Sequence, residues 1–99
     1  MVKHIVMWKL RGESDGERQT HARRAADALR GLSGKIPGMI RLEVGVASDT
    51  GEQSADLVLV TEHEDWQALA TYRTHPEHQK VAALIAELKT ERHVFDFEA

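Results

Sequence analysis

Apolar and polar residues follow one another along this chain in blocks whose periods predict a mixed fold of strands and helices. The segment Val2–Leu10 is rich in Val, Ile, Met and Trp, which favours a strand. A helix is predicted next, because Ser14 and Glu17 have the spacing of a capping box. Apolar residues then recur at helical intervals at Ala22, Ala25, Ala26, Leu29 and Leu32.

The middle of the chain is predicted to form two further strands. Ile36-Pro37-Gly38 interrupts the helical pattern, because Pro and Gly break regular structure. Met39–Ala47 and Asp56–His63 are apolar enough for strands, and the polar segment Ser48–Ser54 between them is predicted to be a loop. His63, at the end of its strand, is predicted to face solvent. The sequence leaves open whether the loop covers a ligand.

The last third of the chain predicts two helices and a closing strand. Asp65–Arg73 is predicted to form a short helix, Pro76 to start a longer one, and Arg92–Phe97 to form the strand. Pro favours the first helical position because its fixed φ suits the helix. The predicted inward positions are Trp66, Leu69 and Ala70 in the short helix and Val81, Leu84, Ile85 and Leu88 in the longer one.

The element order β-α-β-β-α-α-β is typical of an α+β, ferredoxin-like fold, in which helices cover one face of an antiparallel sheet. If the other face met water, the strands would alternate apolar and polar residues. They do not, because Ile5 and Met7 lie on the opposite side of the first strand from Val6 and Trp8. We therefore predict that a second copy packs on the uncovered face, giving a homodimer.

Composition narrows the class of protein without defining a function. The 99 residues predict a single domain, 1–99, and chains of this size often gain stability by association. A net charge of −3 without a basic, aromatic-rich stripe argues against a nucleic-acid partner. The absence of cysteine excludes disulfides and thiolate chemistry. We expect a cytoplasmic protein with no membrane partner, since no apolar run suits a span and the first ten residues lack a signal-peptide core.

The segment Tyr72 to His78 carries the clearest sign of chemistry, a phenol and two imidazoles around Pro76. If a helix starts at Pro76, His75 is its N-cap and His78 lies in its first turn, where the helix dipole is positive. An imidazole there tends to remain neutral at pH 7 and able to accept a proton. His78 is thus a candidate general base and Tyr72 a candidate donor to an enolate. The alternative is that both are structural.

The other candidate residues have equally plain structural alternatives. His4 shares a strand face with Val6 and Trp8, and is either pocket lining or a core histidine with satisfied hydrogen bonds. His75 fits an N-cap better than a chemical role. His75 and His78 are three residues apart, but no carboxylate pair stands beside them at ligand spacing. We therefore predict neither a metal site nor a cofactor.

Four segments carry a family resemblance. They are Val2-Lys3-His4-Ile5-Val6-Met7-Trp8-Lys9-Leu10, Ile36-Pro37-Gly38, Tyr72-Arg73-Thr74-His75-Pro76-Glu77-His78 and Val94-Phe95-Asp96-Phe97. Together they resemble the stress-responsive dimeric α/β-barrel (Dabb) family, which includes olivetolic acid cyclase. The resemblance spans essentially the whole chain. It implies a ferredoxin-like protomer and a homodimeric α/β barrel formed by the two sheets.

The resemblance also implies three alternative functions. The first is a stress-response-type dimer that binds an apolar or phenolic small molecule between sheet and helices. The second is a cofactor-independent polyketide cyclase or lyase, in which His78 and Tyr72 match the cyclase's catalytic pair. The third is a cofactor-independent monooxygenase of the related dimeric-barrel type. The predicted ligand-binding residues are His4, Val6, Trp8, Leu29 and His75.

Two observations limit what the resemblance carries over. The family contains both enzymes and binding proteins, so the sequence leaves open whether this chain is an enzyme. Where the cyclase has bulky aromatic residues on its first helix, this chain has Ala25, Ala26 and Leu29. The shape of the cavity must therefore differ, and the cyclase's substrate is not carried over.

Overall fold

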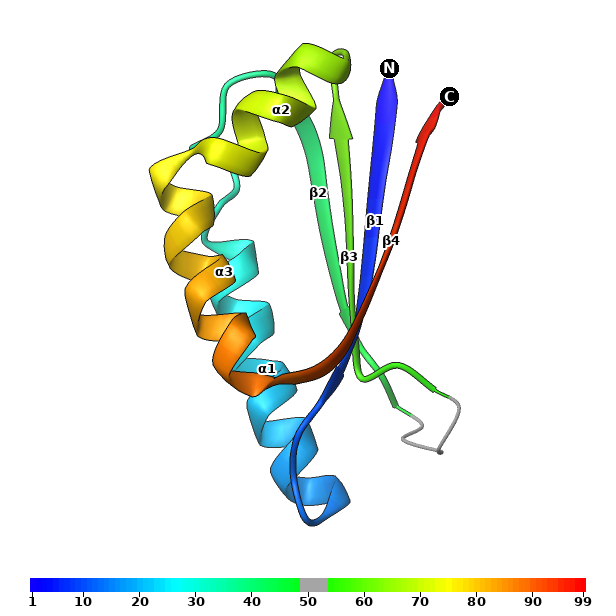
Figure 1. Ribbon diagram of the computed structural model, residues 1–99, viewed down its shortest axis with the longest axis vertical. Coiled ribbons are helices and arrows are strands. Elements are labelled where there is room, and N and C mark those ends of the chain that lie inside the picture. Colours follow the sequence, from blue (N-terminus) through cyan, green and yellow to red (C-terminus); the bar gives the residue numbers. More distant parts are fainter. Residues whose placement is uncertain (49–53) are drawn as a thin grey trace.

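A computed structural model describes residues 1–48 and 54–99 (Figure 1). Its elements are β1 (Val2–Leu10), α1 (Asp15–Arg30), β2 (Met39–Val46), β3 (Leu57–His63), α2 (Trp66–Thr74), α3 (Pro76–Leu88) and β4 (Lys89–Glu98). The strands form one antiparallel sheet in the order β2-β3-β1-β4. The helices lie on one face of that sheet (Figure 1). The predicted α+β, ferredoxin-like fold is confirmed. The loop predicted over Ser48–Ser54 lies largely outside the described residues.

The central strand β1 sets the two faces of the sheet. Its residues alternate between buried positions beneath the helices and more exposed positions on the other face. Val6, on the helix side, lies opposite Leu59 of β3 and Val94 of β4. The same register places His4 opposite Asp96. Residues at alternate positions of the three strands therefore share the helix-facing side of the sheet.

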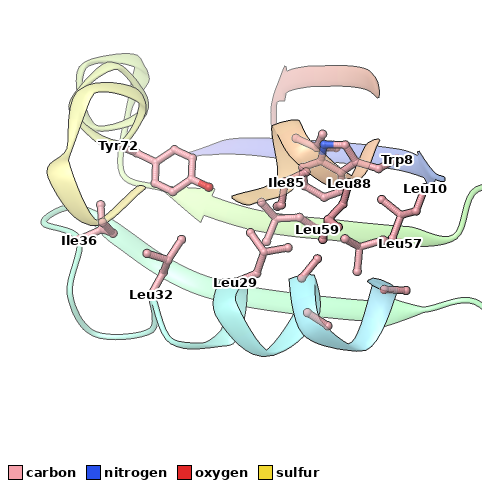
Figure 2. Close-up of a cluster of buried hydrophobic side chains, with 14 of the residues drawn as sticks. Trp8, Leu10, Leu29, Leu32, Ile36, Leu57, Leu59, Tyr72, Ile85 and Leu88 are labelled. Atoms are coloured by element: carbon pink, nitrogen blue, oxygen red, sulfur yellow. The ribbon is translucent and has the colours of Figure 1, made fainter. Parts of the chain in front are cut away.

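The helix α1 lies against this face through small side chains. Ser14 is its N-cap, as predicted, and the Ser14 hydroxyl accepts a hydrogen bond of 3.1 Å from the Glu17 amide. Small side chains on a helix allow its backbone to approach the sheet closely. The core then lies between sheet and helices (Figure 2). Its α1 members are Ala22, Ala25, Ala26 and Leu29, all buried.

Two predicted details of the later elements are wrong. Trp66 is 49% exposed and Ala70 is also exposed, whereas both were predicted to face inward. The inward side of α2 is instead defined by Leu69 and Tyr72, three residues apart. Ala70, at 100° per residue, lies well round the helix from them. The strand β4 begins at Lys89, directly after α3 and before the predicted Arg92.

The sheet face away from the helices carries exposed apolar side chains and is not covered by any element of the described residues. Phe95 is 63% exposed, Met7 42% and Phe97 36%. The register adds Ile5 opposite Phe95, with Val60 on the other side of Ile5. The predicted two-faced apolar pattern of the strands is therefore present. None of the described helices is long and apolar enough to cross a membrane.

Candidate functional site

A pocket of about 260 Å³ opens between the sheet and the helices α1 and α3. Six residues predicted for the site line it: His4, Val6, Trp8, Leu29, Tyr72 and His78. The other lining residues were not predicted for the site: Leu59, Val81, Ala82, Ile85, Ala86, Lys89 and Arg92. The lining is mostly apolar, and its neutral polar groups gather where α2 meets α3.

Tyr72 supplies a phenol from the buried side of α2. Its side chain is 1% exposed, and the ring centroid lies 4.3 Å from that of His78. Burial raises the pKa of Tyr72 to about 12, although the charge of Arg92 lowers that pKa slightly. The hydroxyl has no hydrogen-bond partner within residues 1–48 and 54–99. It points into the cluster formed by Leu29 and its apolar neighbours (Figure 2).

His78 presents a basic nitrogen from the first turn of α3. Its Nδ1 lies 3.1 Å from the Arg73 carbonyl oxygen. A carbonyl can only accept, so Nδ1 carries the proton and Nε2 is the bare nitrogen of the neutral ring. Burial lowers the pKa of His78 more than this hydrogen bond raises it. The imidazole is therefore neutral at pH 7, with a lone pair on Nε2.

His4 is held by a chain of polar contacts at the edge of the site. Its Nδ1 lies 2.5 Å from Asp96 Oδ1, and the other oxygen of Asp96 accepts a bond of 2.8 Å from the Arg73 guanidinium. Burial lowers the pKa of His4 more than Asp96 raises it. The His4 ring stands edge-on to Tyr72, with centroids 5.7 Å apart. Asp96 therefore fixes the orientation of His4 from the neighbouring strand.

His63 belongs to this cluster, although it was predicted to face solvent. It is fully buried, with its ring centroid 5.1 Å from that of Tyr72. Its Nε2 lies 2.9 Å from the Thr61 hydroxyl, while Nδ1 has no partner among the described residues. The alternation in β3 could have shown this, because Leu57, Leu59, Thr61 and His63 share one face. His63 supports the Tyr72 ring without lining the pocket.

His75 has a structural position, apart from the pocket lining. It is the N-cap of α3, and its Nδ1 accepts a hydrogen bond of 3.1 Å from the Glu77 amide. His75 was predicted both as this cap and as a ligand-binding residue, and it does not line the pocket. Among the described residues, no group of three or more His, Asp or Glu side chains could hold a metal ion.

The polar end of the pocket combines one donor and one acceptor in an apolar surrounding. The neutral Tyr72 phenol can donate to a ligand oxygen, and Nε2 of His78 can accept from a ligand hydroxyl. The same pair suits removal of a proton from a carbon next to a carbonyl, with Nε2 as base and the phenol as donor to the enolate. The arrangement can therefore hold a phenol or a carbonyl compound.

Comparisons with known proteins agree with this fold. A model of the family described as "Stress responsive A/B Barrel Domain" matches residues 2–99. A dimeric protein of unknown function and ferredoxin-like fold from Bacteroides fragilis is 32% identical, with a TM-score of 0.86 over 99% of this chain and 95% of that one. A Dabb family protein from Mesorhizobium loti is 21% identical, with a TM-score of 0.76 over 99% and 95% of the two chains.

A more distant similarity shows the fold alone. SnoaB, a cofactor-independent oxygenase from Streptomyces nogalater, is 15% identical, with a TM-score of 0.76 over 99% of this chain and 91% of that one. The chain has no match among curated proteins. The comparisons therefore assign a family and a fold, and they name no ligand for this pocket.

Proposed function

The chain belongs to the Dabb family of stress responsive A/B barrel domains, and on this premise we propose that it binds an apolar or phenolic small molecule as a homodimer. The ligand lies in the pocket between sheet and helices. One observation carries the proposal: a mostly apolar pocket ends in a Tyr72 hydroxyl with no hydrogen-bond partner among the described residues. This hydroxyl opens on the pocket and is free to donate a hydrogen bond to a ligand oxygen.

The size and lining of the pocket support a small aromatic ligand. An apolar cavity of about 150 Å³ accepts benzene, and this pocket measures about 260 Å³. Trp8 and Ile85 are both at most 5% exposed and provide apolar wall. A phenol bound with its ring against them would bring its oxygen to the polar end, where Tyr72 donates and His78 accepts.

The uncovered sheet face supports the homodimer. Its exposed aromatic residues Phe95 and Phe97 have ring centroids 5.6 Å apart, and they lie beside Ile5 and Met7 of β1. A contiguous exposed apolar patch of this kind marks an interaction surface. The structurally similar proteins from Bacteroides fragilis, Thermobifida fusca and Jannaschia are each described as dimeric. A cytoplasmic location stays a prediction from the sequence.

The test of binding is a thermal-shift comparison of 4-phenylphenol with biphenyl. We expect 4-phenylphenol to stabilise the wild type by about 2.7 kcal/mol at a hundredfold excess over its Kd, and biphenyl less. Tyr72→Phe should lose the preference for the phenol, and His78→Ala should weaken it. His21→Ala, which alters an α1 histidine bonded to the Arg11 carbonyl, is the matched control. Equal shifts in wild type and Tyr72→Phe would contradict the proposal.

A second candidate function has one specific observation in its favour. The neutral imidazole of His78 lies beside the Tyr72 ring, with centroids 4.3 Å apart, and the contact of Nδ1 with the Arg73 carbonyl leaves Nε2 unprotonated. A cofactor-independent cyclase or lyase needs this pair: Nε2 takes a proton from the carbon next to a carbonyl, and the phenol donates to the enolate oxygen. The monooxygenase alternative has only the shared fold behind it and stays a prediction from the sequence.

The enzymatic candidate is tested by deuterium exchange at the α-carbon of 4-phenylbutan-2-one, followed by NMR. An enzyme of this class should accelerate exchange, and His78→Ala should lower the rate by about 10²-fold or more while the protein remains folded. His21→Ala should retain the wild-type rate. Binding of the ketone without any faster exchange would leave the binding function and exclude this chemistry.

A further inference from the structure

The mouth of the pocket carries two cations, whereas no acidic residue lines its wall. Lys89 and Arg92 are the charged residues of the lining, and they lie at the start of β4, where the strand leaves α3 (Figure 1). The whole chain has a net charge of −3. The charge at the pocket mouth is therefore opposite in sign to that of the protein.

Lys89 and Arg92 differ from other cations near the site in having no carboxylate partner among the described residues. Lys3 has a carboxylate partner in Glu62, and Arg73 has one in Asp96. Neither Lys89 nor Arg92 has an ion-pair partner within residues 1–48 and 54–99. Their charges are thus available to a ligand.

Arg92 acts on the interior of the pocket as well as on its rim. It lies opposite Trp8 in the β1–β4 pairing, on the side of the sheet that faces the helices. Its charge lowers the pKa of Tyr72, and it lowers the pKa values of His4 and His78 as well. A negative group bound at Arg92 would therefore meet a positive potential within a mostly apolar wall.

We propose that the ligand of this pocket carries a carboxylate, held by Arg92 and Lys89 at the mouth, with its apolar or phenolic body extending inward. This inference rests on the proposed binding function. The Arg92 guanidinium can bind a carboxylate through two parallel hydrogen bonds, while Lys89 adds a second positive charge. The opposite end of the ligand reaches Tyr72 and His78 with a hydroxyl or a carbonyl oxygen.

The spacing along β1 sets the length of such a ligand. Trp8, opposite Arg92, and His4, at the polar end, are four residues apart in the strand. At about 3.3 Å per residue this separation is about 13 Å. A biphenyl with one polar substituent at each end spans a similar distance. The anionic probe is 4′-hydroxybiphenyl-4-carboxylate, and its neutral counterpart of the same shape is 4′-hydroxybiphenyl-4-carboxamide.

The experiment is titration calorimetry of both probes against wild type and variants. We expect the wild type to bind the carboxylate about tenfold more tightly than the carboxamide, a difference of about 1.4 kcal/mol. Added salt should reduce this preference, because the mouth is open to solvent. Arg92→Gln should abolish most of the preference and Lys89→Gln part of it. Arg92→Lys should retain part, and Arg24→Gln, at an exposed position on α1, should retain it in full.

Two other results would overturn the inference in distinguishable ways. If the wild type binds both probes equally, or if Arg92→Gln retains the preference, the carboxylate site is excluded while the apolar pocket remains. If neither probe binds, the proposed binding function fails, and the carboxylate inference fails with it. The carboxamide separates these cases, because it tests the pocket without the charge.

Discussion

Burial sets the protonation of the rings around the pocket more than their hydrogen bonds do. Burial is the largest influence on the pKa of Tyr72, which it raises, and on those of His4, His63 and His78, which it lowers. All four rings are consequently neutral at pH 7. Asp96, which contacts His4, is held in turn by Arg73. A site of neutral donors and acceptors favours ligands that form hydrogen bonds without transferring a proton in the ground state.

The buried His63 predicts a loss of stability in acid. Burial lowers its pKa from 6.5 to about 4, so the unfolded chain takes up a proton before the folded chain as the pH falls. The contribution is complete above pH 6.5 and is lost between pH 6.5 and about 4, and it amounts to about 3 kcal/mol. Urea denaturation across this range should show the loss in the wild type.

The control for this prediction is His63→Gln, whose amide can bond to Thr61 but does not titrate. The free energy of unfolding of this variant should fall less than that of the wild type over the same pH range. The two proteins share all other titrating groups, and only the wild type has His63. Identical pH profiles for the two proteins would show that His63 is not the group responsible.

The candidate site was partly predictable at the residue scale. Tyr72 and His78 were found because they lie six residues apart around a proline, a local pattern. His63 was missed although the alternation along β3 places it on the helix-facing side of the sheet. Asp96 was missed because its contact with His4 comes from pairing between distant parts of the chain. Arg92 was missed for the same reason, since only the β4 register brings it opposite Trp8.

At the scale of elements, the break between α2 and α3 creates the polar end of the pocket. His75 has an extended backbone, with φ −64° and ψ 135°, which ends α2 and starts α3 at Pro76. Residues before proline favour this conformation. The break allows Tyr72 at the end of one helix and His78 at the start of the next to bring their rings together.

The cap at this break is expected to be worth about 1 kcal/mol. His75→Ala removes the acceptor for the Glu77 amide and should lower the free energy of unfolding by that amount. His75→Asn should lose less, because asparagine is a favoured N-cap residue. Because His78 lies in the capped turn, the alanine variant should also bind 4-phenylphenol more weakly. Equal stabilities for the two variants in urea denaturation would contradict this role.

The helices and strands were predictable because their apolar periods are clear. The side of α2 that faces the core was not predictable. Nine residues give α2 only a few turns, so several choices of inward face fit its apolar residues. Packing on the sheet selects Leu69 and Tyr72, which leaves Trp66 exposed. The start of β4 at Lys89 was missed because no polar turn separates it from α3.

At the scale of the whole molecule, the uncovered face of the sheet is the basis for the proposed homodimer. Helices cover one face, and the other presents Met7 and Phe95 to solvent in a single chain. A second copy packed sheet to sheet would bury both faces. The apolar residues on both sides of β1 predicted this from the sequence. Among the described residues, no helix or loop of the same chain covers this face.

Phe95→Glu should convert the dimer to a monomer. The change places a charge at the most exposed of the large apolar residues, on the face of the proposed interface, and a buried unpaired charge is strongly unfavourable. Light scattering after size-exclusion chromatography gives the mass. The matched control is Trp66→Glu, which places the same charge at an exposed aromatic residue on α2, away from that face. A dimeric Phe95→Glu protein, or a monomeric wild type, would refute the interface.

The most direct test of the binding pocket is NMR of the wild type with bound 4-phenylphenol, by intermolecular NOEs to assigned methyl groups. The proposed function predicts NOEs to the methyls of Leu29, Leu59 and Ile85, which line the pocket. NOEs confined to Val58 and Val60, on the uncovered sheet face, would contradict it, as would the absence of any ligand contact at saturating phenol.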